Sequence, residues 1–272
     1  MFYLSIDWNP NIELFKIGSF AVRYYSLMFV IAFVFGIQII KKIFKKENIS
    51  IEKVDSLFIY CIIATLLGAR IGHFLFYDTE FLFKHPLEVL LPVRFDPFRF
   101  TGYQGLASHG AAIGMIIAMF FYSKKVVHKP LLWTLDRVVI PVASGAIFVR
   151  IGNLINSEII GKPTNSDFGF IFRQLGEDFP RHPTQLYEAF GYLLTFIALW
   201  FVYWKTDKKD KLGYLFGLFM VMLWSVRLIV EFFKEAQVEN RGSWDLNTGQ
   251  ILSIPLILVG IYFMFRVQKK EA

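Results

Sequence analysis

Seven apolar stretches, each close to the length of a membrane-spanning helix, recur along the 272-residue chain. A helix needs about 20 apolar residues to cross the hydrocarbon core of a bilayer. Hydrophobic residues make up 55% of the chain and aromatic residues 18%, which is typical of an integral membrane protein. We therefore predict an all-α membrane protein, a single transmembrane domain over residues 1–272. Its predicted spans are 24–40, 56–77, 106–122, 131–149, 184–204, 212–230 and 248–265.

Lysine is concentrated in the segments that follow the first, third, fifth and seventh spans, such as "KKIFKKENISIEK" and "KTDKKDK". Short Lys/Arg-rich loops remain in the cytoplasm, so we predict an outer N-terminus and a cytoplasmic C-terminus. The same placement explains the net charge of +7 without a nucleic-acid partner. We expect no secretory signal peptide, because no basic segment precedes an apolar core at the start of the chain.

The segments on the predicted outer side are longer. Residues 78–105 hold three prolines and many phenylalanines, and we expect an interfacial arm on the outer leaflet. Residues 162–183 are polar and predict a small extracytoplasmic head. The single cysteine, Cys61, lies in an apolar span and is interpreted as a packing residue.

Ionisable and strongly polar side chains at membrane depth are costly, and they indicate a functional site. All but two of those in this chain fall near the outer ends of spans. The exceptions are Asp136 and Arg137, which we interpret as anchors that snorkel to the cytoplasmic surface. The outer set is Arg70, His109, Arg150, Asn153, Glu158, His182, Gln185, Glu188, Arg227 and Glu231.

The densest of these positions is "VRIGNLINSEIIGKPT", residues 149–164, which we expect to be an irregular polar segment. Arginine forks pair bidentately with phosphate, and the phosphates at this depth belong to phospholipids. His109 can move a proton near neutral pH. Since we see no nucleophile elbow and no metal-ligand pair, we expect no metal or cofactor, and a nucleophile that arrives with a second substrate.

Simpler interpretations remain open at several positions. Arg227 and Glu231 are four residues apart and suit a plain ion pair on one helical face, and His109 suits a packed histidine. The glycines at 68, 110, 114 and 145 suit close helix packing.

Three other functions compete with a lipid-modifying enzyme. An anion transporter would need polar residues in both halves of the membrane, but the cytoplasmic halves are almost uniformly apolar. An intramembrane protease would need a serine facing a histidine, but Ser108 and His109 are adjacent and point apart on a helix. A lipid-binding scaffold would leave His109 unexplained.

The motifs resemble those of the bacterial prolipoprotein diacylglyceryl transferases. "RIGNLINSEIIG", from Arg150 to Gly161, is similar to the family signature. Further similarity lies in "YYSLMF" at 24–29, "GAR" at 68–70, "QGLASHGAAIG" at 104–114, "RHPTQLYE", "RLIVEFF" and "TGQILSIP" at 248–255. The sequence departs from the family at Ser26, Ala111, Ala112 and Leu223, and over residues 147–149.

The resemblance implies a reaction and a location. The family transfers the diacylglyceryl group of phosphatidylglycerol to the lipobox cysteine of a preprolipoprotein signal peptide, and releases glycerol phosphate. The implied location is the bacterial cytoplasmic (inner) membrane, with the active site toward the outer face. The implied partners are phosphatidylglycerol, the preprolipoprotein and membrane lipids.

The resemblance also implies roles for individual residues. His109, Arg150 and Arg227 are the expected catalytic residues, with the arginines on the lipid phosphate and the histidine accepting the thiol proton. Tyr25, Asn153, Glu158 and Glu231 are expected to bind substrate together with the arginines. Support from behind the site is expected from Gln104, Asn156, Gly161, His182 and Gln185.

Overall fold

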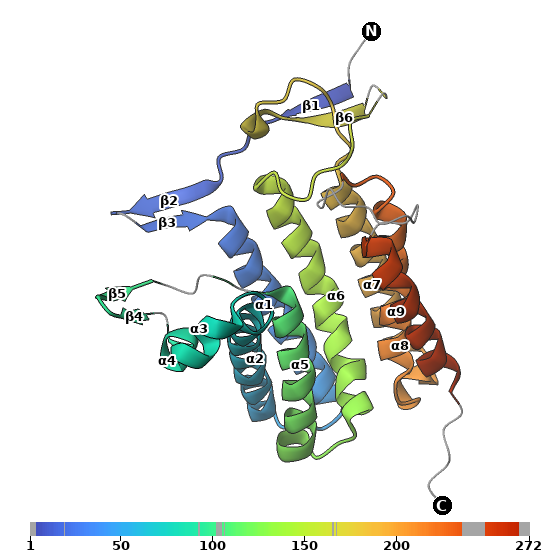
Figure 1. The fold of residues 1–272 in the computed structure, drawn as a ribbon. Helices are drawn as coiled ribbons and strands as arrows, with labels where there is room; N and C mark the ends of the chain where they lie inside the picture. Colours follow the sequence, from blue (N-terminus) through green and yellow to red (C-terminus); the bar gives the residue numbers. More distant parts are fainter. Residues whose placement is uncertain are drawn as a thin grey trace, which may run out of the picture. The chain divides into compact units, whose positions relative to one another are not determined.

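The structure is a computed structural model, and it describes residues 4–18, 20–91, 93–101, 105, 107–164, 166, 168–235 and 248–266. Helices dominate it (Figure 1). The long helices are α1 (Tyr24–Lys46), α2 (Glu52–Tyr77), α5 (Ser108–Tyr122), α6 (Leu131–Ile155), α7 (Thr184–Lys205), α8 (Tyr214–Val230) and α9 (Thr248–Phe265). The short ones are α3 (Thr79–Lys84), α4 (Pro86–Leu90), the π-helical η1 (Ser123–Val127), and the 3-10 turns η2 (Arg173–Leu175) and η3 (Asp207–Asp210).

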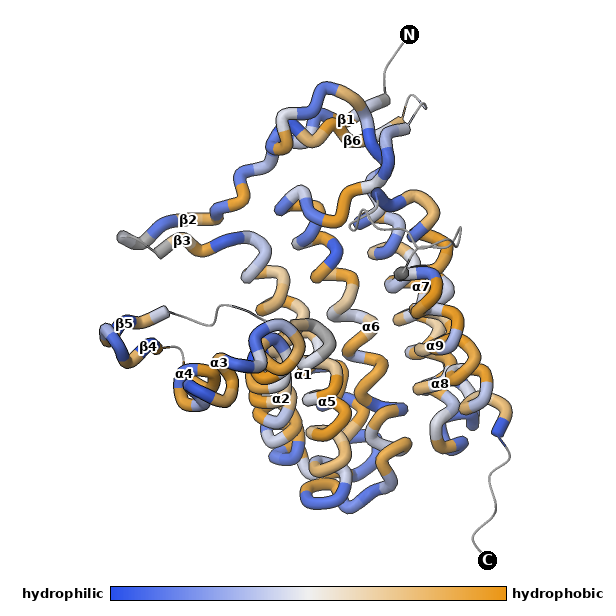
Figure 2. Tube along the Cα trace, in the orientation of Figure 1, coloured by the Kyte–Doolittle hydropathy of each residue, from blue (hydrophilic) through white to orange (hydrophobic). Residues whose placement is uncertain are grey.

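Five helical segments are long and apolar enough to cross a membrane. They are residues 24–46, 52–77, 110–127, 131–155 and 184–205. Two further apolar helices, 214–230 and 249–265, are shorter, with 17 residues each. In Figure 2 the helices are mainly hydrophobic in colour and many of their connections are hydrophilic. The predicted class, a mostly helical membrane protein, is therefore confirmed. Seven spans and their orientation remain predictions.

The all-α prediction is wrong for the segments outside the helices, whose described residues contain six short strands. β1 (Leu4–Trp8) pairs in parallel with β6 (Phe168–Phe172). Two antiparallel pairs join β2 (Glu13–Ile17) to β3 (Phe20–Arg23) and β4 (Val93–Phe95) to β5 (Phe98–Phe100). The strands form because exposed backbone groups outside the helices still need hydrogen-bond partners. Leu154, Phe170 and Phe172 form a small core under the β1–β6 pair.

The chain divides into two compact units, residues 41–134 and residues 1–40 with 135–272. In the first unit, α2 and α5 pack backbone against backbone. A Cβ atom on Gly110 would lie 2.1 Å from the carbonyl oxygen of Gly68, and one on Gly114 would lie 2.6 Å from that of Ala64. Close packing is thus confirmed as the role of these glycines. At Gly145 an added Cβ would make only an ordinary 3.6 Å contact.

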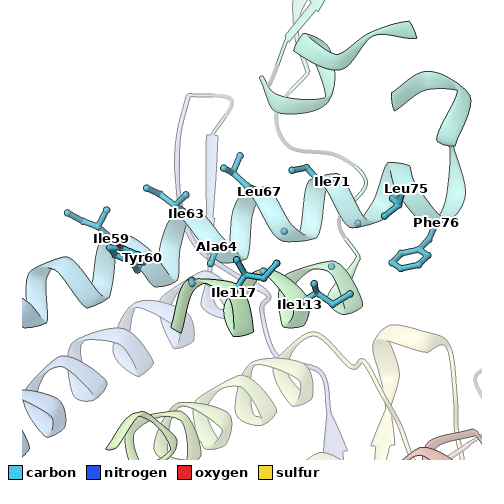
Figure 3. Close-up of a pocket in the computed structure, with 15 residues that line it drawn as sticks. Ile59, Tyr60, Ile63, Ala64, Leu67, Ile71, Leu75, Phe76, Ile113 and Ile117 are labelled. Carbon is cyan, nitrogen blue, oxygen red and sulfur yellow. The ribbon is translucent and has the colours of Figure 1, made fainter. Parts of the chain in front are cut away.

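A groove of about 430 Å³ follows the same helix pair (Figure 3). Its walls are hydrocarbon side chains of α2 and α5, among them Ile63, Leu67, Ile113 and Ile117. The glycines form its floor, because they leave the two backbones bare of side chains. Surfaces of this kind suit the acyl chains of a bilayer.

The prediction that Asp136 snorkels to the surface is wrong. Its side chain is fully buried, and its carboxylate accepts hydrogen bonds from the backbone N–H groups of Gly213 (2.7 Å) and Phe216 (2.8 Å). These groups open α8, where the first turn of a helix has N–H groups without partners within the helix. Asp136 therefore caps α8 from α6. Arg137 is buried as well, 3.9 Å from the same carboxylate.

Candidate functional site

Helix α6 carries Arg150 and Asn153 within its last two turns and ends at Ile155. The predicted helix end at 149 is wrong, and the predicted irregular segment begins only after Ile155. Residues three apart lie on one helical face, and the Arg150 guanidinium donates to Oδ1 of Asn153 at 3.0 Å. The polar side chains of Arg150 and Asn153 form a hydrogen bond with each other, so their presence does not end the helix.

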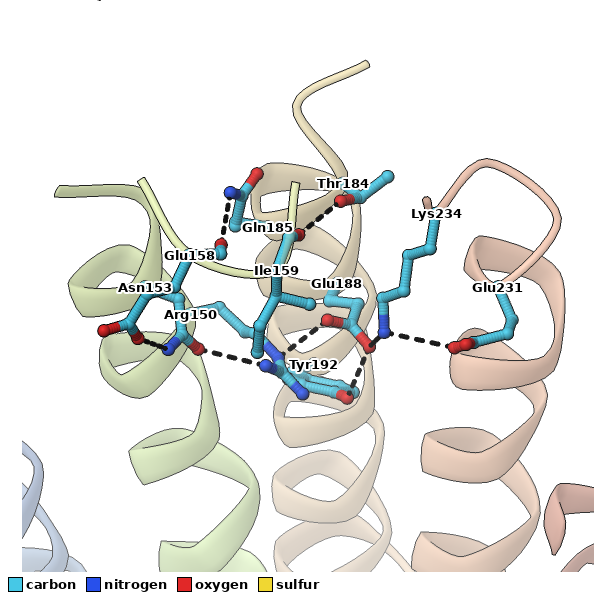
Figure 4. Close-up of polar contacts among 10 residues, drawn as sticks. All are labelled: Arg150, Asn153, Glu158, Ile159, Thr184, Gln185, Glu188, Tyr192, Glu231 and Lys234. Carbon is cyan, nitrogen blue, oxygen red and sulfur yellow. Dashed lines mark hydrogen bonds and ion pairs between the residues drawn. The ribbon is translucent and has the colours of Figure 1, made fainter. Parts of the chain in front are cut away.

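Arg150 meets a carboxylate from the next helix. Its Nε lies 2.8 Å from Oε2 of Glu188, in the second turn of α7 (Figure 4). The Glu188 side chain is completely buried, and that of Arg150 is 12% exposed. The guanidinium also lies beside the ring of Tyr192, 5.9 Å from its centroid. One edge of Arg150 is thereby held by protein groups.

Glu188 is shared between two cations. Its second oxygen, Oε1, accepts from Nζ of Lys234 at 2.9 Å, and Lys234 lies 3.2 Å from a carboxylate oxygen of Glu231 (Figure 4). The Tyr192 hydroxyl also donates to Glu188, at 3.3 Å. An isolated buried carboxylate would be very costly, and two cations offset that cost. The chain Arg150–Glu188–Lys234–Glu231, called the charged relay below, thus joins α6, α7 and the end of α8.

A second polar chain continues from Arg150 into the loop after α6. Nδ2 of Asn153 donates to one carboxylate oxygen of Glu158 at 3.0 Å, and Nδ2 of Asn156 donates to the other at 3.1 Å. Ser157 and Ile159 adopt left-handed backbone angles, with φ of 53° and 56°. This conformation is strained for a β-branched residue such as Ile159, and such strain often accompanies functional loops.

The start of α7 holds this loop in place. Gln185, which is fully buried, donates to the carbonyl oxygen of Glu158 at 2.6 Å, and Thr184 donates to that of Ile159 at 2.9 Å. A Cβ atom on Gly161 would lie 2.3 Å from the carbonyl oxygen of His182. Glycine is therefore required there by close approach between the loop and the segment that leads into α7.

The segment before α7 is tied to the end of α8 by Arg181. Its guanidinium bonds both carboxylate oxygens of Glu177 at 2.6 Å and one of Glu235 at 2.6 Å. The bonds to Glu177 and the nearby charges raise the pKa of Arg181 further above its usual value, so the group stays charged. Arg181 therefore fixes the distance between the segment before α7 and the end of α8.

The other predicted residues of this unit surround the relay. The ring of Tyr25 lies against Gly152, where an added Cβ would come within 2.8 Å. Nδ1 of His182 lies 3.2 Å from the hydroxyl of Tyr187. The guanidinium of Arg227 lies over the ring of Trp224, 5.5 Å from its centroid, and its Nε has no hydrogen-bond partner in the described part of the chain. Arg227 is thus a half-buried cation with spare donor capacity.

An apolar cavity of about 540 Å³ lies between α7, α8 and the segment before α7. His182, Leu186, Tyr187, Phe190 and Phe233 are among its lining residues. The His182–Tyr187 pair places polar atoms at an otherwise hydrocarbon wall. A cavity of this character suits the upper part of an acyl chain.

Three predicted residues belong to the other unit, residues 41–134. His109 is the second residue of α5, but its side chain lies outside the described part of the structure, and so does the whole of Gln104. Arg70 also belongs to this unit. Its buried guanidinium donates hydrogen bonds to main-chain carbonyls, so its position does not require a ligand. Its Nε donates to the carbonyl of Val89 at 2.9 Å and its Nη2 to that of Glu88 at 3.1 Å.

Sequence reasoning missed the central role of Glu188 and overlooked Lys234. Glu188 is among the ionisable residues that the sequence places at membrane depth, but it receives no role there, and Lys234 is not singled out at all. The available signal was the position of Glu188 in the second turn of an apolar helix. Among the described residues, no three His, Cys, Asp or Glu side chains are arranged to hold a metal ion.

Taken together, the site consists of three cations and three carboxylates at one end of α6, α7 and α8. The cations are Arg150, Arg227 and Lys234, and the carboxylates are Glu158, Glu188 and Glu231. Formally they balance. A guanidinium that is held on one edge by a fixed carboxylate can present its remaining N–H groups to an incoming anion. The arrangement can therefore bind a phosphate, and no described residue of the site pairs a serine or cysteine nucleophile with a base.

Comparison with known proteins supplies the family. The family model of prolipoprotein diacylglyceryl transferase matches residues 12–266. A phosphatidylglycerol–prolipoprotein diacylglyceryl transferase of Bacteroides fragilis is 42% identical, with 99% of this chain and 98% of the relative covered. Proteins of the same name from Chloroherpeton thalassium and Porphyromonas gingivalis are 37% and 36% identical, each with 97% of this chain and 95% of the relative covered. The chain therefore belongs to the prolipoprotein diacylglyceryl transferase family.

Proposed function

We propose that this protein transfers the diacylglyceryl group of phosphatidylglycerol to the thiol of the lipobox cysteine in preprolipoproteins, the first step of lipoprotein maturation. The observation that carries the proposal is Arg150, held on one edge by Glu188 in a family whose relatives are named for this reaction. An arginine fixed in this way is preorganised for a phosphate oxygen.

The proposed step is a displacement at carbon. The peptide sulfur attacks the glyceryl carbon that carries the phosphodiester, and a C–S bond forms as the C–O bond breaks. The electron pair of the broken bond leaves with the oxygen of glycerol phosphate. Arg150 and Arg227 stabilise the charge that develops on that oxygen, and His109 accepts the thiol proton.

The remaining residues orient these groups. Tyr25, Asn153, Glu158 and Glu231 bind the headgroup or hold the arginines. Asn156, Gly161, His182, Gln185 and Gln104 support them. Two residues join this set on the strength of the geometry: Glu188 and Lys234, which act as positioning residues for Arg150.

The proposed setting is the bacterial inner membrane, crossed seven times, with the N-terminus and the site toward the outer face. The segment 78–105 forms an arm on the outer leaflet, and residues 162–183 form the head. Support comes from the lysines of η1 and η3, which belong to the connections predicted to be cytoplasmic.

Labelling tests the orientation. In a Cys61→Ala background, Ser166→Cys should react with an impermeant thiol reagent added outside intact cells, whereas Lys208→Cys should react only after lysis. The reverse pattern would overturn the proposed topology.

Mass analysis tests the reaction. The purified protein is incubated with phosphatidylglycerol and a lipobox peptide, and the peptide should gain one diacylglyceryl group. Phosphatidylcholine in place of phosphatidylglycerol, and a Cys→Ser peptide, serve as controls. Arg150→Ala and His109→Ala should each abolish the product while the protein still inserts, and full activity in both variants would refute the assigned site.

A further inference from the structure

The hairpin β4–β5 has two chemically opposite faces. Its register pairs Val93 with Phe100, Arg94 with Arg99, and Phe95 with Phe98. Directly paired residues in an antiparallel ladder point to the same face, and successive residues alternate. One face is therefore wholly apolar and the other carries two arginines side by side. The apolar face consists of Val93, Phe95, Phe98 and Phe100.

Most of the apolar face is left exposed by the described residues. Phe98 is 73% exposed and Phe100 is 77% exposed. An isolated two-stranded hairpin is marginal in water, so a stable one requires an apolar surface against it. The rest of the arm has the same character, because Phe83 and Leu87 are also largely exposed.

The cationic face has no anionic partner among the described residues. Arg94 and Arg99 stand directly opposite each other, and like charges in that relation destabilise a hairpin. Arg94 lies over the ring of Phe81, 5.8 Å from its centroid. Neither guanidinium has a carboxylate partner within 4.0 Å among the described residues. An anion between them would convert repulsion into attraction.

The arm is anchored at membrane depth. Arg70 lies seven residues before the end of α2, about 10 Å along its axis. It binds the carbonyls of Glu88 and Val89 and thereby draws the end of α4 toward the span. The Glu88 carboxylate in turn accepts from the backbone N–H of Phe95 at 3.0 Å. The hairpin is thus tied to a membrane-spanning helix below that helix's end.

We propose that the β4–β5 hairpin is an interfacial anchor for anionic phospholipid, with its aromatic face in the acyl region and its Arg94–Arg99 pair on a lipid phosphate. The occupant is a membrane surface, since the apolar face and the cations belong to one short ribbon on a membrane-spanning unit. The site is separate in sequence from the charged relay, and it adds a second phosphate-binding element.

Spin labelling measures the depth of the hairpin. In a Cys61→Ala background, a nitroxide on Phe98→Cys is studied in the full-length protein in nanodiscs. Its accessibility to oxygen should exceed its accessibility to a water-soluble nickel complex. A nitroxide on Asp178→Cys, an exposed residue of the head, is the matched control and should show the opposite order.

Charge is tested by lipid composition. In nanodiscs of phosphatidylcholine with one-third phosphatidylglycerol, Arg94→Gln with Arg99→Gln should lower the ratio of docked to undocked label about 30-fold. High salt should weaken docking of the parent hairpin. Lys84→Gln removes a cation of the same arm that is already paired with Glu80, so it should change little.

Several outcomes would overturn the proposal. The membrane anchor is refuted if the label at 98 is as accessible to nickel as the head label, or is shielded from both reagents and so packed on protein. Equal docking of the parent hairpin in pure phosphatidylcholine and in the anionic mixture refutes the proposed preference for anionic phospholipid, whether or not the double variant folds. Lipidation of a peptide is measured in a separate assay. Failure of the membrane anchor can therefore be distinguished from failure of the proposed transfer reaction.

Discussion

Two arginines with little exposure, Arg70 in α2 and Arg150 in α6, both lie near the ends of their helices but have different partners. Arg70 is 5% exposed and binds two main-chain carbonyls, with its guanidinium 4.7 Å from the centre of the Phe74 ring. Arg150 binds the side chains of Glu188 and Asn153. Main-chain carbonyls at a helix end are fixed parts of the fold, whereas side-chain partners can shift when an anion enters. The contacts of the first arginine hold α4 in place, and those of the second agree with its proposed role in phosphate binding.

The same contrast holds for the surroundings of each arginine. Around Arg70, the fold depends on glycines that bring α2 and α5 into backbone contact. Around Arg150, it depends on paired charges and amides. Substitutions in the first region should therefore act on stability, and substitutions in the second on activity.

The largest effect is expected for Arg150→Ala. Loss of the group proposed to stabilise the leaving oxygen should lower the transfer rate about 1,000-fold. Arg150→Lys keeps the charge but loses the planar fork, and we expect a rate about 100-fold below the parent. Initial rates of peptide lipidation measure both. If Arg150→Lys matched the parent, the bidentate role would be wrong.

Substitutions in the charged relay should give the next largest loss of transfer rate. Glu188→Gln leaves two cations without their shared carboxylate, which should move Arg150 and lower the rate about 100-fold. Lys234→Met should cause a smaller loss, and Lys234→Arg should restore most of the rate. A purely structural role would lower thermal stability without changing kcat relative to KM, so both constants and the melting temperature are measured.

Substitutions at the backbone contact between α2 and α5 should have a smaller effect, and they should act on stability and not on the transfer rate. Gly110→Ala places a methyl group 2.1 Å from the Gly68 carbonyl and should destabilise the α2–α5 pair by about 1–3 kcal/mol. Gly145→Ala is the matched control, since its methyl group would lie 3.6 Å from Ala32. Thermal unfolding in detergent compares the two, and equal melting temperatures would contradict the packing argument.

The smallest effect on activity is expected for Arg70→Gln. Two carbonyls of α4 lose their donor, at a cost of about 1 kcal/mol, since they can turn toward interfacial water. Limited proteolysis should cut the arm, residues 78–105, faster, while the lipidation rate changes by less than about threefold. A loss comparable to that of Arg150→Ala would remove the distinction between the two arginines.

Much of the fold was predictable because membrane helices can be recognised in a sequence by the length and hydropathy of their apolar segments. The ends of the helices were less predictable. Helix α6 continues through Arg150 and Asn153, because these side chains bond to each other and to Glu188. The six short strands were missed, since segments of three to five residues outside the spans leave no clear periodic signal.

The candidate site was predictable in its residue types but not in its connections. Arginine, asparagine and glutamate near the end of a span already pointed to a phosphate. The role of Asp136 was not predictable, because it caps α8, and the sequence of α6 alone does not show that α8 begins beside it.

The sequence by itself determined which stretches can enter a membrane and where polar side chains interrupt them, because hydrophobicity is a property of each segment. Tertiary structure alone decided which charges meet. Glu188 and Lys234 are 46 residues apart, and only the packing of α7 beside the end of α8 brings carboxylate and ammonium within 2.9 Å. Pairing energy depends on that separation and on burial, and neither quantity exists until the helices have assembled.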